Sequence, residues 1–230
     1  MNELFEESLF AGVTLSLAAY LLGIVMRKKF KSGIFNPLLI SIIISIGVLT
    51  VCHVDYEAYN KGAEYLSWFL TPATVCLAIP LYEQLKILMK NRRAVIAGLM
   101  MGALTSMGII LALSLILKLG HKEYVTLLPK SITTAIGMGV SEELGGYVTI
   151  TVAVIVMTGI LGNMFGEQIC RLFRIKEPIS RGLAIGAASH AIGTAKAIEL
   201  GEIEGAMSSL AIAVSGIITV ALAPLFATFL

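Results

Sequence analysis

The chain alternates between long hydrophobic stretches and short segments that hold most of its charges. Six of these stretches reach about 20 residues, the length at which a helix crosses about 30 Å of hydrocarbon. They cover residues 8–26, 34–52, 65–85, 94–117, 147–166 and 206–230. Two more, at 127–146 and 182–198, are apolar but rich in Gly, Ser and Thr, which predicts broken or re-entrant helices.

Composition supports a membrane protein. Of the 230 residues, 57% are hydrophobic and 14% charged, against about 25% charged in soluble domains. We therefore expect an all-α polytopic membrane protein, with residues 1–230 forming one membrane domain. A net charge of +2 is too small and too scattered for nucleic-acid binding. The three cysteines form no C-x-x-C pair, so neither a disulfide framework nor a metal site is expected, and no cofactor is indicated.

The positions of the basic residues predict how the chain is oriented across the membrane. They concentrate in three clusters, which the positive-inside rule places in the cytoplasm: Arg27, Lys28, Lys29 and Lys31; Lys86, Lys90, Arg92 and Arg93; and Arg171, Arg174, Lys176 and Arg181. The acidic N-terminus then lies outside, and with no cleavage site after it the first stretch remains a membrane helix. For the third cluster to return inside, 127–146 must enter and leave on the outer side.

An internal repeat is a competing interpretation. An offset of 57 residues aligns Leu70 and Pro72 with Leu127 and Pro129, although chance also produces identities in so apolar a sequence. Taken literally, the repeat makes both segments cross the membrane alike. We prefer the charge pattern, because four clustered cations are costly to place outside.

Three polar interruptions are candidate binding elements. The first holds Thr71, Pro72 and Thr74, and the second begins at Pro129 and holds Lys130, Ser131, Thr133 and Thr134. Thr and Pro suit the start of a half-helix, whose free N–H groups and positive dipole end attract a carboxylate. The alternatives are a proline kink for the first and close helix packing for the second. For the second interruption, Lys130 favours a segment that lines a cavity, because close helix packing does not need an ammonium group.

The third interruption holds Ser189, His190, Thr194 and Lys196. In a continuous helix, His190 and Thr194 share one face with Gly186, Gly193 and Ala197. An ionisable residue inside a membrane indicates function, although a lone histidine can be a packing residue and a lysine can extend to the surface. His190 could carry a proton or bind a 2-oxygen. Lys196 could balance charge, with Glu199 at i+3 as its partner.

An enzyme is the weaker hypothesis. Gly137-Met138-Gly139 follows no strand and completes no phosphate-binding loop. Ser189 and His190 are adjacent, so on a helix their side chains point about 100° apart, which suits a hydrolase poorly. We expect no catalytic residues.

Four separated motifs resemble the LrgB/CidB family of bacterial membrane proteins over essentially the whole chain. They are residues 35–39, residues 70–74, residues 127–134 with 141–146, and residues 189–197. The resemblance implies an antiholin-like protein of the bacterial inner membrane that acts with a small LrgA/CidA-like partner on murein hydrolase activity and autolysis. Related proteins are linked to pyruvate uptake, and the similar plastid glycolate/glycerate transporter moves small 2-hydroxy acids.

The residues and the resemblance together predict a transporter of small monocarboxylates such as pyruvate, glycolate or lactate, with antiholin-like regulation as the alternative. The predicted substrate-binding residues are Thr71, Thr74, Ser131, Thr133, Thr134, Ser189, His190, Thr194 and Lys196. Small-residue helix faces also suit a homodimer. The substrate, the coupling ion and the direction of movement are left open.

Overall fold

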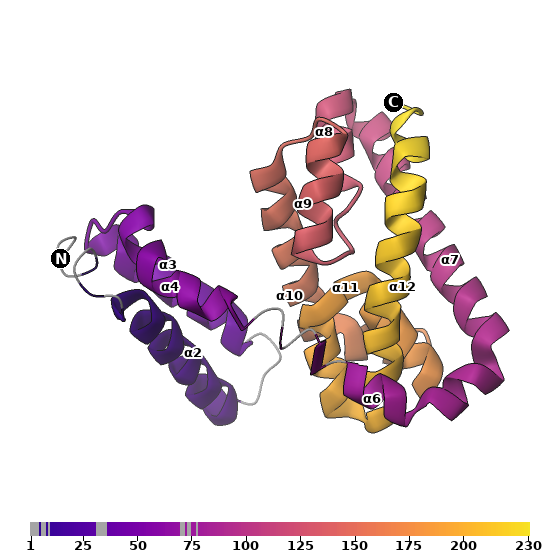
Figure 1. Ribbon diagram of the computed structural model, residues 1–230, viewed down its shortest axis with the longest axis horizontal. Coiled ribbons are helices and arrows are strands. Elements are labelled where there is room, and N and C mark those ends of the chain that lie inside the picture. The colour runs from indigo at the N-terminus through magenta and orange to yellow at the C-terminus, as the bar shows by residue number, and fades with distance from the viewer. Residues whose placement is uncertain are drawn as a thin grey trace. The chain divides into compact units, whose positions relative to one another are not determined.

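A computed structural model describes residues 5, 8, 10–30, 36–69, 72, 75–76 and 78–230, and helices are its regular elements (Figure 1). Four helical segments in this described part are long and apolar enough to cross a membrane: α2 (Ala11–Phe30), Met89–Leu117 of α7 (Leu85–Leu117), α10 (Val148–Leu172) and α12 (Glu202–Ala227). The chain divides into two compact units, Met1–Cys76 and Leu77–Leu230. We describe each unit by itself.

The first unit packs α2 against α3 (Pro37–Val51) and α4 (Tyr56–Ser67). Asn36 begins α3, because its side-chain oxygen accepts hydrogen bonds from the amides of Leu38 (2.8 Å) and Leu39 (3.3 Å). Proline follows at the first helical position, where its missing N–H costs nothing. A side chain at Gly12 would overlap the α4 backbone, so this glycine allows α2 and α4 to approach closely.

One predicted span is wrong. Residues 65–85 do not form a single helix, since α4 ends at Ser67 and the next long helix is preceded by the six-residue α6 (Ala78–Glu83). The amphipathic α4 lies mostly between the predicted spans 34–52 and 65–85, and α3, at 15 residues, is shorter than a typical membrane helix. Four long apolar helices therefore replace the predicted six in the described part, and the predicted repeat stays a prediction.

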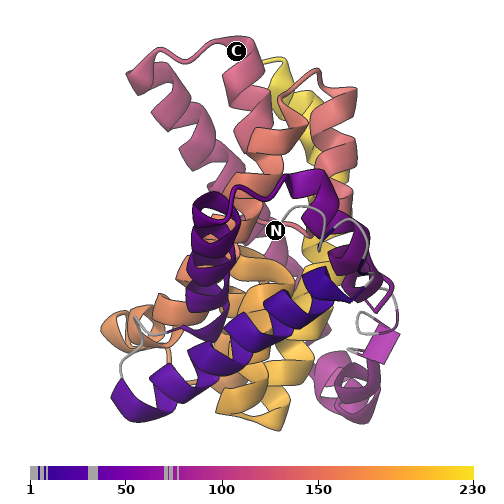
Figure 2. The ribbon, with the colours of Figure 1, turned by 90° about the vertical axis from the view of Figure 1, so that its left-hand side faces the viewer.

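The second unit is built around α12, which contacts α6, α7, α8 (His121–Leu127), α9 (Thr134–Glu143) and α11 (Pro178–Leu200). The Tyr124 hydroxyl donates to the carbonyl of Phe226 at 2.8 Å and joins α8 to the C-terminal end of α12. Figures 1 and 2 show α6 at the opposite end of this unit from the C-terminus. The second and third basic clusters lie at the α6 end, because Ala94, which follows the second cluster, and Ile179, which lies within the third, line one cavity.

The α8 and α9 helices form a hairpin that reverses within residues 128–133. They have 7 and 10 residues, so neither can cross about 30 Å of hydrocarbon. After the reversal, the chain comes back to the level of α8, because the Tyr147 amide donates to the Thr126 hydroxyl at 2.8 Å. This geometry agrees with the re-entrant segment predicted from the charges. The half-helix, however, begins at Thr134 with Thr133 at its N-cap, not at Pro129, which belongs to the turn after α8.

The α11 helix is broken at His190, whose φ of 42° and ψ of −141° are not helical. The first half runs beside α12 in the same direction, since Gly182 lies against Glu204 and Gly186 against Ser208. The second half runs the other way, since Thr194 binds Ser208 and Ile198, one turn later, lies against Gly205.

The α11 segment is therefore a second hairpin, as the predicted broken helix requires. The shared helical face predicted for Gly186, His190 and Ala197 is wrong, because the two halves have different axes. All three residues are nevertheless buried in the structure.

Candidate functional site

The site centres on the turn of the first hairpin. The ammonium of Lys130 donates to the hydroxyl of Ser131 at 2.8 Å and to that of Ser106 on α7 at 3.2 Å. The two hydroxyl oxygens lie 3.3 Å apart. In the described part of the chain, no carboxylate lies within ion-pairing distance of Lys130. The half-buried ammonium therefore has hydroxyl partners but no counter-charge.

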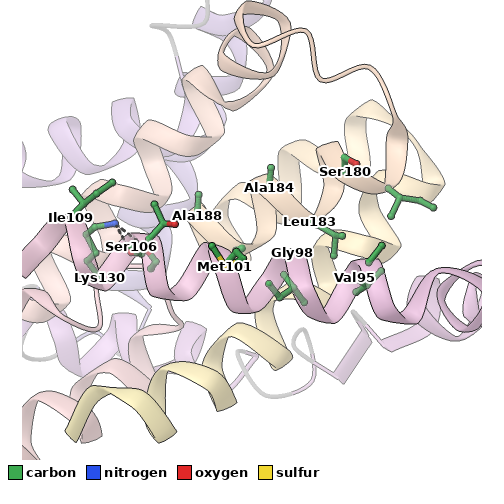
Figure 3. A pocket seen from close by; sticks show the side chains of 17 residues that line it. Val95, Gly98, Met101, Ser106, Ile109, Lys130, Ser180, Leu183, Ala184 and Ala188 are labelled. Atoms are coloured by element: carbon green, nitrogen blue, oxygen red, sulfur yellow. Dashed lines mark hydrogen bonds between the residues drawn. The ribbon is translucent and has the colours of Figure 1, made fainter. Parts of the chain in front are cut away.

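A cavity of about 570 Å³ opens beside this cluster, between α7 and the first half of α11. Figure 3 shows Lys130 and Ser106 near Ala188 at one end of it, and Val95 and Ser180 toward the other. Small residues such as Gly98 and Ala184 form much of the wall. None of the residues lining it is acidic, so the only formal charge on its described lining is that of Lys130.

Ser106 lies near the middle of the apolar part of α7, so in a membrane-spanning α7 this cluster lies near mid-depth. At a rise of about 1.5 Å per residue, Ser106 lies about 18 Å along α7 from Ala94 and about 16 Å from Leu117. The first half of α11, from Pro178 to Ser189, is likewise about 18 Å long. The tips of the two hairpins thus meet at mid-depth, which is where transporters built from broken helices bind their substrates.

A second cavity, of about 490 Å³, lies on the α10 side of the same tips. Lys130 and Ala188 line both cavities, and the second is completed by Ser189, Thr158 and residues from Leu161 to Leu172 of α10. Lys130 is therefore placed between two separate cavities, each lined by α11.

The break at His190 is held by hydrogen bonds from α10. One ring nitrogen, Nε2, lies 3.0 Å from the carbonyl oxygen of Ile155, and the Asn163 amide donates to the carbonyl of Ile192 at 2.8 Å. The Thr194 hydroxyl donates to the His190 carbonyl at 2.9 Å. Polar groups released by the break thus find partners within the protein, as buried groups require.

Glycines on α10 allow this close approach. A side chain at Gly162 would overlap Ser189, and one at Gly159 would meet the His190 ring and Ile192. The broken tip therefore rests directly on the surface of α10, as small residues permit in membrane interfaces.

Lys196 belongs to an ion-pair cluster nearer the α6 end. Its ammonium lies 3.2 Å from Glu167 on α10 and 3.4 Å from Glu199. The predicted Glu199 partner is present, and Glu167 adds a second carboxylate. The structure does not bring Lys196 to either cavity that Lys130 lines.

The nine predicted site residues separate into groups. Ser131 and Ser189 line the cavities beside Lys130. His190 and Thr194 are buried behind them, while Thr133 and Thr134 form the start of α9 without lining either cavity. Thr71 and Thr74 lie outside the described residues.

Sequence reasoning missed Ser106 and Thr105, which line the first cavity from α7. Two adjacent hydroxyl residues in the middle of a predicted span were the available signal. Sequence reasoning noted the polarity of Lys130 but did not include it among the binding residues. The described residues contain no group of three or more His, Cys, Asp or Glu arranged to hold a metal ion.

Comparison with known proteins gives one family. A sequence profile described as the LrgB-like family matches residues 16–229. Proteins named "Antiholin-like protein LrgB" from Bacillus mycoides (strain KBAB4), Bacillus cereus (strain B4264) and Bacillus anthracis (strain CDC 684 / NRRL 3495) are each 35% identical to this chain over 222 residues, covering 96% of both sequences. No solved structure matches.

Proposed function

Because this chain belongs to the LrgB family, we propose that it acts in the membrane as an antiholin-like protein, the role that its relatives' names describe. The multi-pass apolar helices support a membrane location. The name also suggests its partner, a small holin-like membrane protein of the LrgA type. In this role the chain restrains murein hydrolase activity and autolysis.

Deletion of the gene in its own bacterium tests this role. We expect faster autolysis and higher murein hydrolase activity, both reversed when the wild-type chain is restored. The small partner should co-purify with the chain after mild detergent extraction. Unchanged autolysis in the deletion strain, with no partner recovered, would contradict the proposal.

A specific feature favours a second function, the movement of small monocarboxylates. The observation that carries it is the Lys130 ammonium, which donates to the hydroxyls of Ser106 and Ser131 but has no counter-charge within ion-pairing distance in the described part of the chain. An ammonium buried without a counter-charge is costly, and an anion would relieve that cost. Two hydroxyl donors beside it suit a carboxylate, whose oxygens accept several hydrogen bonds.

The arrangement of the cavities suggests how such an anion would move. Lys130 lines one cavity between α7 and α11 and another between α10 and α11. An anion bound at Lys130 would be reached from one cavity or the other if the hairpin tips shifted slightly. Alternating access around a fixed midplane site works in this way in transporters with broken helices. The two functions are compatible, because carboxylate flux can influence autolysis through metabolism.

Counterflow in liposomes tests the second function. Vesicles that contain only this protein and are loaded with unlabelled pyruvate, glycolate or lactate should accumulate the same labelled acid transiently. Dicarboxylates should be poorer substrates, because the first cavity offers one cation. If no acid of two or three carbons is exchanged, the transport proposal fails while the antiholin-like role stands.

A further inference from the structure

The turn between α10 and α11 forms a small basic cavity that neither proposed function uses. Its volume is about 270 Å³, and its lining holds four cations: Arg171, Arg174, Lys176 and Arg181. The other lining residues are Glu167, Cys170 and Ile175. Four positive groups around one cavity indicate an anionic ligand.

The turn itself brings these cations together. The amide of Ile175 donates to the carbonyl of Cys170 at 2.8 Å, and that of Arg174 to the carbonyl of Arg171 at 3.0 Å. Arg174 adopts the left-handed conformation, with φ of 56°, that closes a helix end of this type. The chain then enters α11, so that Arg181 in the first turns of that helix lies across the cavity from the end of α10.

The charges in the cavity are only partly neutralised. Glu167 pairs with Arg171 but also with Lys196, which brings its own positive charge, and Arg181 pairs with Glu204 at 3.5 Å. Arg174 and Lys176 are exposed, and within the described residues neither has an acidic side chain at ion-pairing distance. Two cations are thus left for a ligand.

Exposed apolar side chains flank these basic residues in the sequence. Leu172 and Phe173, between the basic residues, are 77% and 70% exposed, and Ile169, one turn earlier on α10, is 50% exposed. Ile169 and Leu172 also line the second cavity, whereas Phe173 lines neither cavity beside Lys130. In a membrane-spanning α10, Phe173 contacts acyl chains, while the cations at the end of the helix lie at the level of the headgroups. A free inorganic ion would use the basic residues but not this apolar border.

We propose that the cavity at the α10–α11 turn binds the phosphate of an anionic phospholipid, with Arg174 and Lys176 contacting the headgroup and the neighbouring, exposed Phe173 lying beside its acyl chains. The site lies at the basic end of the second unit, which the positive-inside rule places in the cytoplasmic leaflet. It adjoins the start of α11 and the Arg181–Glu204 pair. A bound lipid would therefore hold the first turns of α11 in place.

Native mass spectrometry of the full chain released from nanodiscs tests the proposal. Nanodiscs of equal parts phosphatidylglycerol and phosphatidylcholine should yield protein that retains phosphatidylglycerol selectively. The double variant Arg174→Gln/Lys176→Gln removes two cations at the headgroup and should weaken retention about thirtyfold. The control Lys28→Gln/Lys29→Gln makes the same charge change on exposed residues at the end of α2 and should retain the lipid as the wild type does.

Two outcomes would overturn the proposal. One is equal phosphatidylglycerol retention by the wild type and the Arg174→Gln/Lys176→Gln variant. The other is displacement of the lipid by millimolar inorganic phosphate, which would make a free anion the ligand. Because these substitutions lie on an exposed turn, circular dichroism should show unchanged helix content, and lost retention then reports on the site.

Discussion

The ammonium of Lys196 lies 3.2 Å from a carboxylate oxygen of Glu167, a contact that joins the second half of α11 to α10. The two side chains are 19% and 23% exposed, so solvent only partly screens the pair. They are 29 positions apart in the sequence, on the two sides of the α10–α11 turn. The pair therefore fixes the returning arm of the hairpin to its neighbour.

Loss of either charge should destabilise the protein. We expect Lys196→Met and Glu167→Gln each to lower the unfolding temperature in detergent, because each removes the half-buried contact between α10 and α11 and leaves Glu167 only Arg171, or Lys196 only Glu199, as an ion-pair partner among the described residues. In the double variant, the two losses should fall short of their sum by about 1 kcal/mol. Thermal unfolding followed by far-ultraviolet circular dichroism measures the cycle. Strictly additive losses would show that the contact contributes nothing.

A second prediction concerns the buried polar network that fixes the α8–α9 hairpin. The Thr151 hydroxyl is shared between the Ser141 hydroxyl at 2.7 Å and the Thr126 carbonyl at 2.9 Å. Thr151→Val keeps the shape but leaves both groups without this partner, which should cost about 1 to 3 kcal/mol. The matched control is Thr149→Val, an exposed position on the same helix, where unfolding should be nearly unchanged. Equal effects at the two positions would refute the network's role.

A third prediction concerns the contact between α10 and the broken tip of α11. Gly162→Ala should destabilise the protein by about 1 to 3 kcal/mol, because the added methyl overlaps Ser189 and forces the tip away. Gly108→Ala on α7, where nothing lies within 4 Å of the added carbon, should be neutral or slightly stabilising. The measurement is the unfolding temperature of each purified variant, compared with that of the wild type. A Gly162→Ala protein as stable as the Gly108→Ala protein would show that the tip does not rest on α10.

The long helices were predictable because hydrophobic length alone defines them. The predicted span 94–117 falls within α7, and the span 147–166 matches α10 from its N-cap Tyr147 onward. Over about 20 apolar residues in a membrane, a helix is the structure that satisfies the backbone hydrogen bonds. The same criterion fails at 65–85, where hydropathy joins the end of one helix to the start of another. The amphipathic α4 was missed because its mixed composition resembles that of a loop.

The site was predictable only where its contacts are local. Glu199 as a partner of Lys196 follows from helical spacing, whereas Glu167 comes from another helix. The break at His190 lies in a segment whose small and polar residues predict an interruption, but no proline marks its position. The contact of Ser106 with Lys130 joins residues 24 positions apart, and only the folding of the first hairpin against α7 creates it.

A fourth prediction concerns Ser106 as a donor to the bound anion. Ser106→Ala removes one of the two hydroxyls beside Lys130 and should raise the apparent Kd for a monocarboxylate about tenfold. Ser114→Ala on the same helix is the control, because the buried Ser114 hydroxyl has no hydrogen-bond partner among the described residues and should leave the affinity unchanged. Binding of labelled acid to detergent-solubilised protein provides the measurement. An unchanged Kd in Ser106→Ala would exclude that hydroxyl from the site.

The most direct test of the central claim is the uptake of labelled pyruvate, glycolate and lactate by liposomes that contain the wild type, Lys130→Gln or Lys122→Gln. Lys122 is an exposed lysine of the same hairpin, so its replacement makes the same charge change away from the cavities. We expect uptake of at least one acid by the wild type and Lys122→Gln. Uptake by Lys130→Gln should be at least a hundredfold lower at equal helix content, as expected for a lost charge-assisted contact of roughly 3 kcal/mol. Equal uptake by all three proteins would contradict the role of Lys130, and no uptake by the wild type would contradict transport itself.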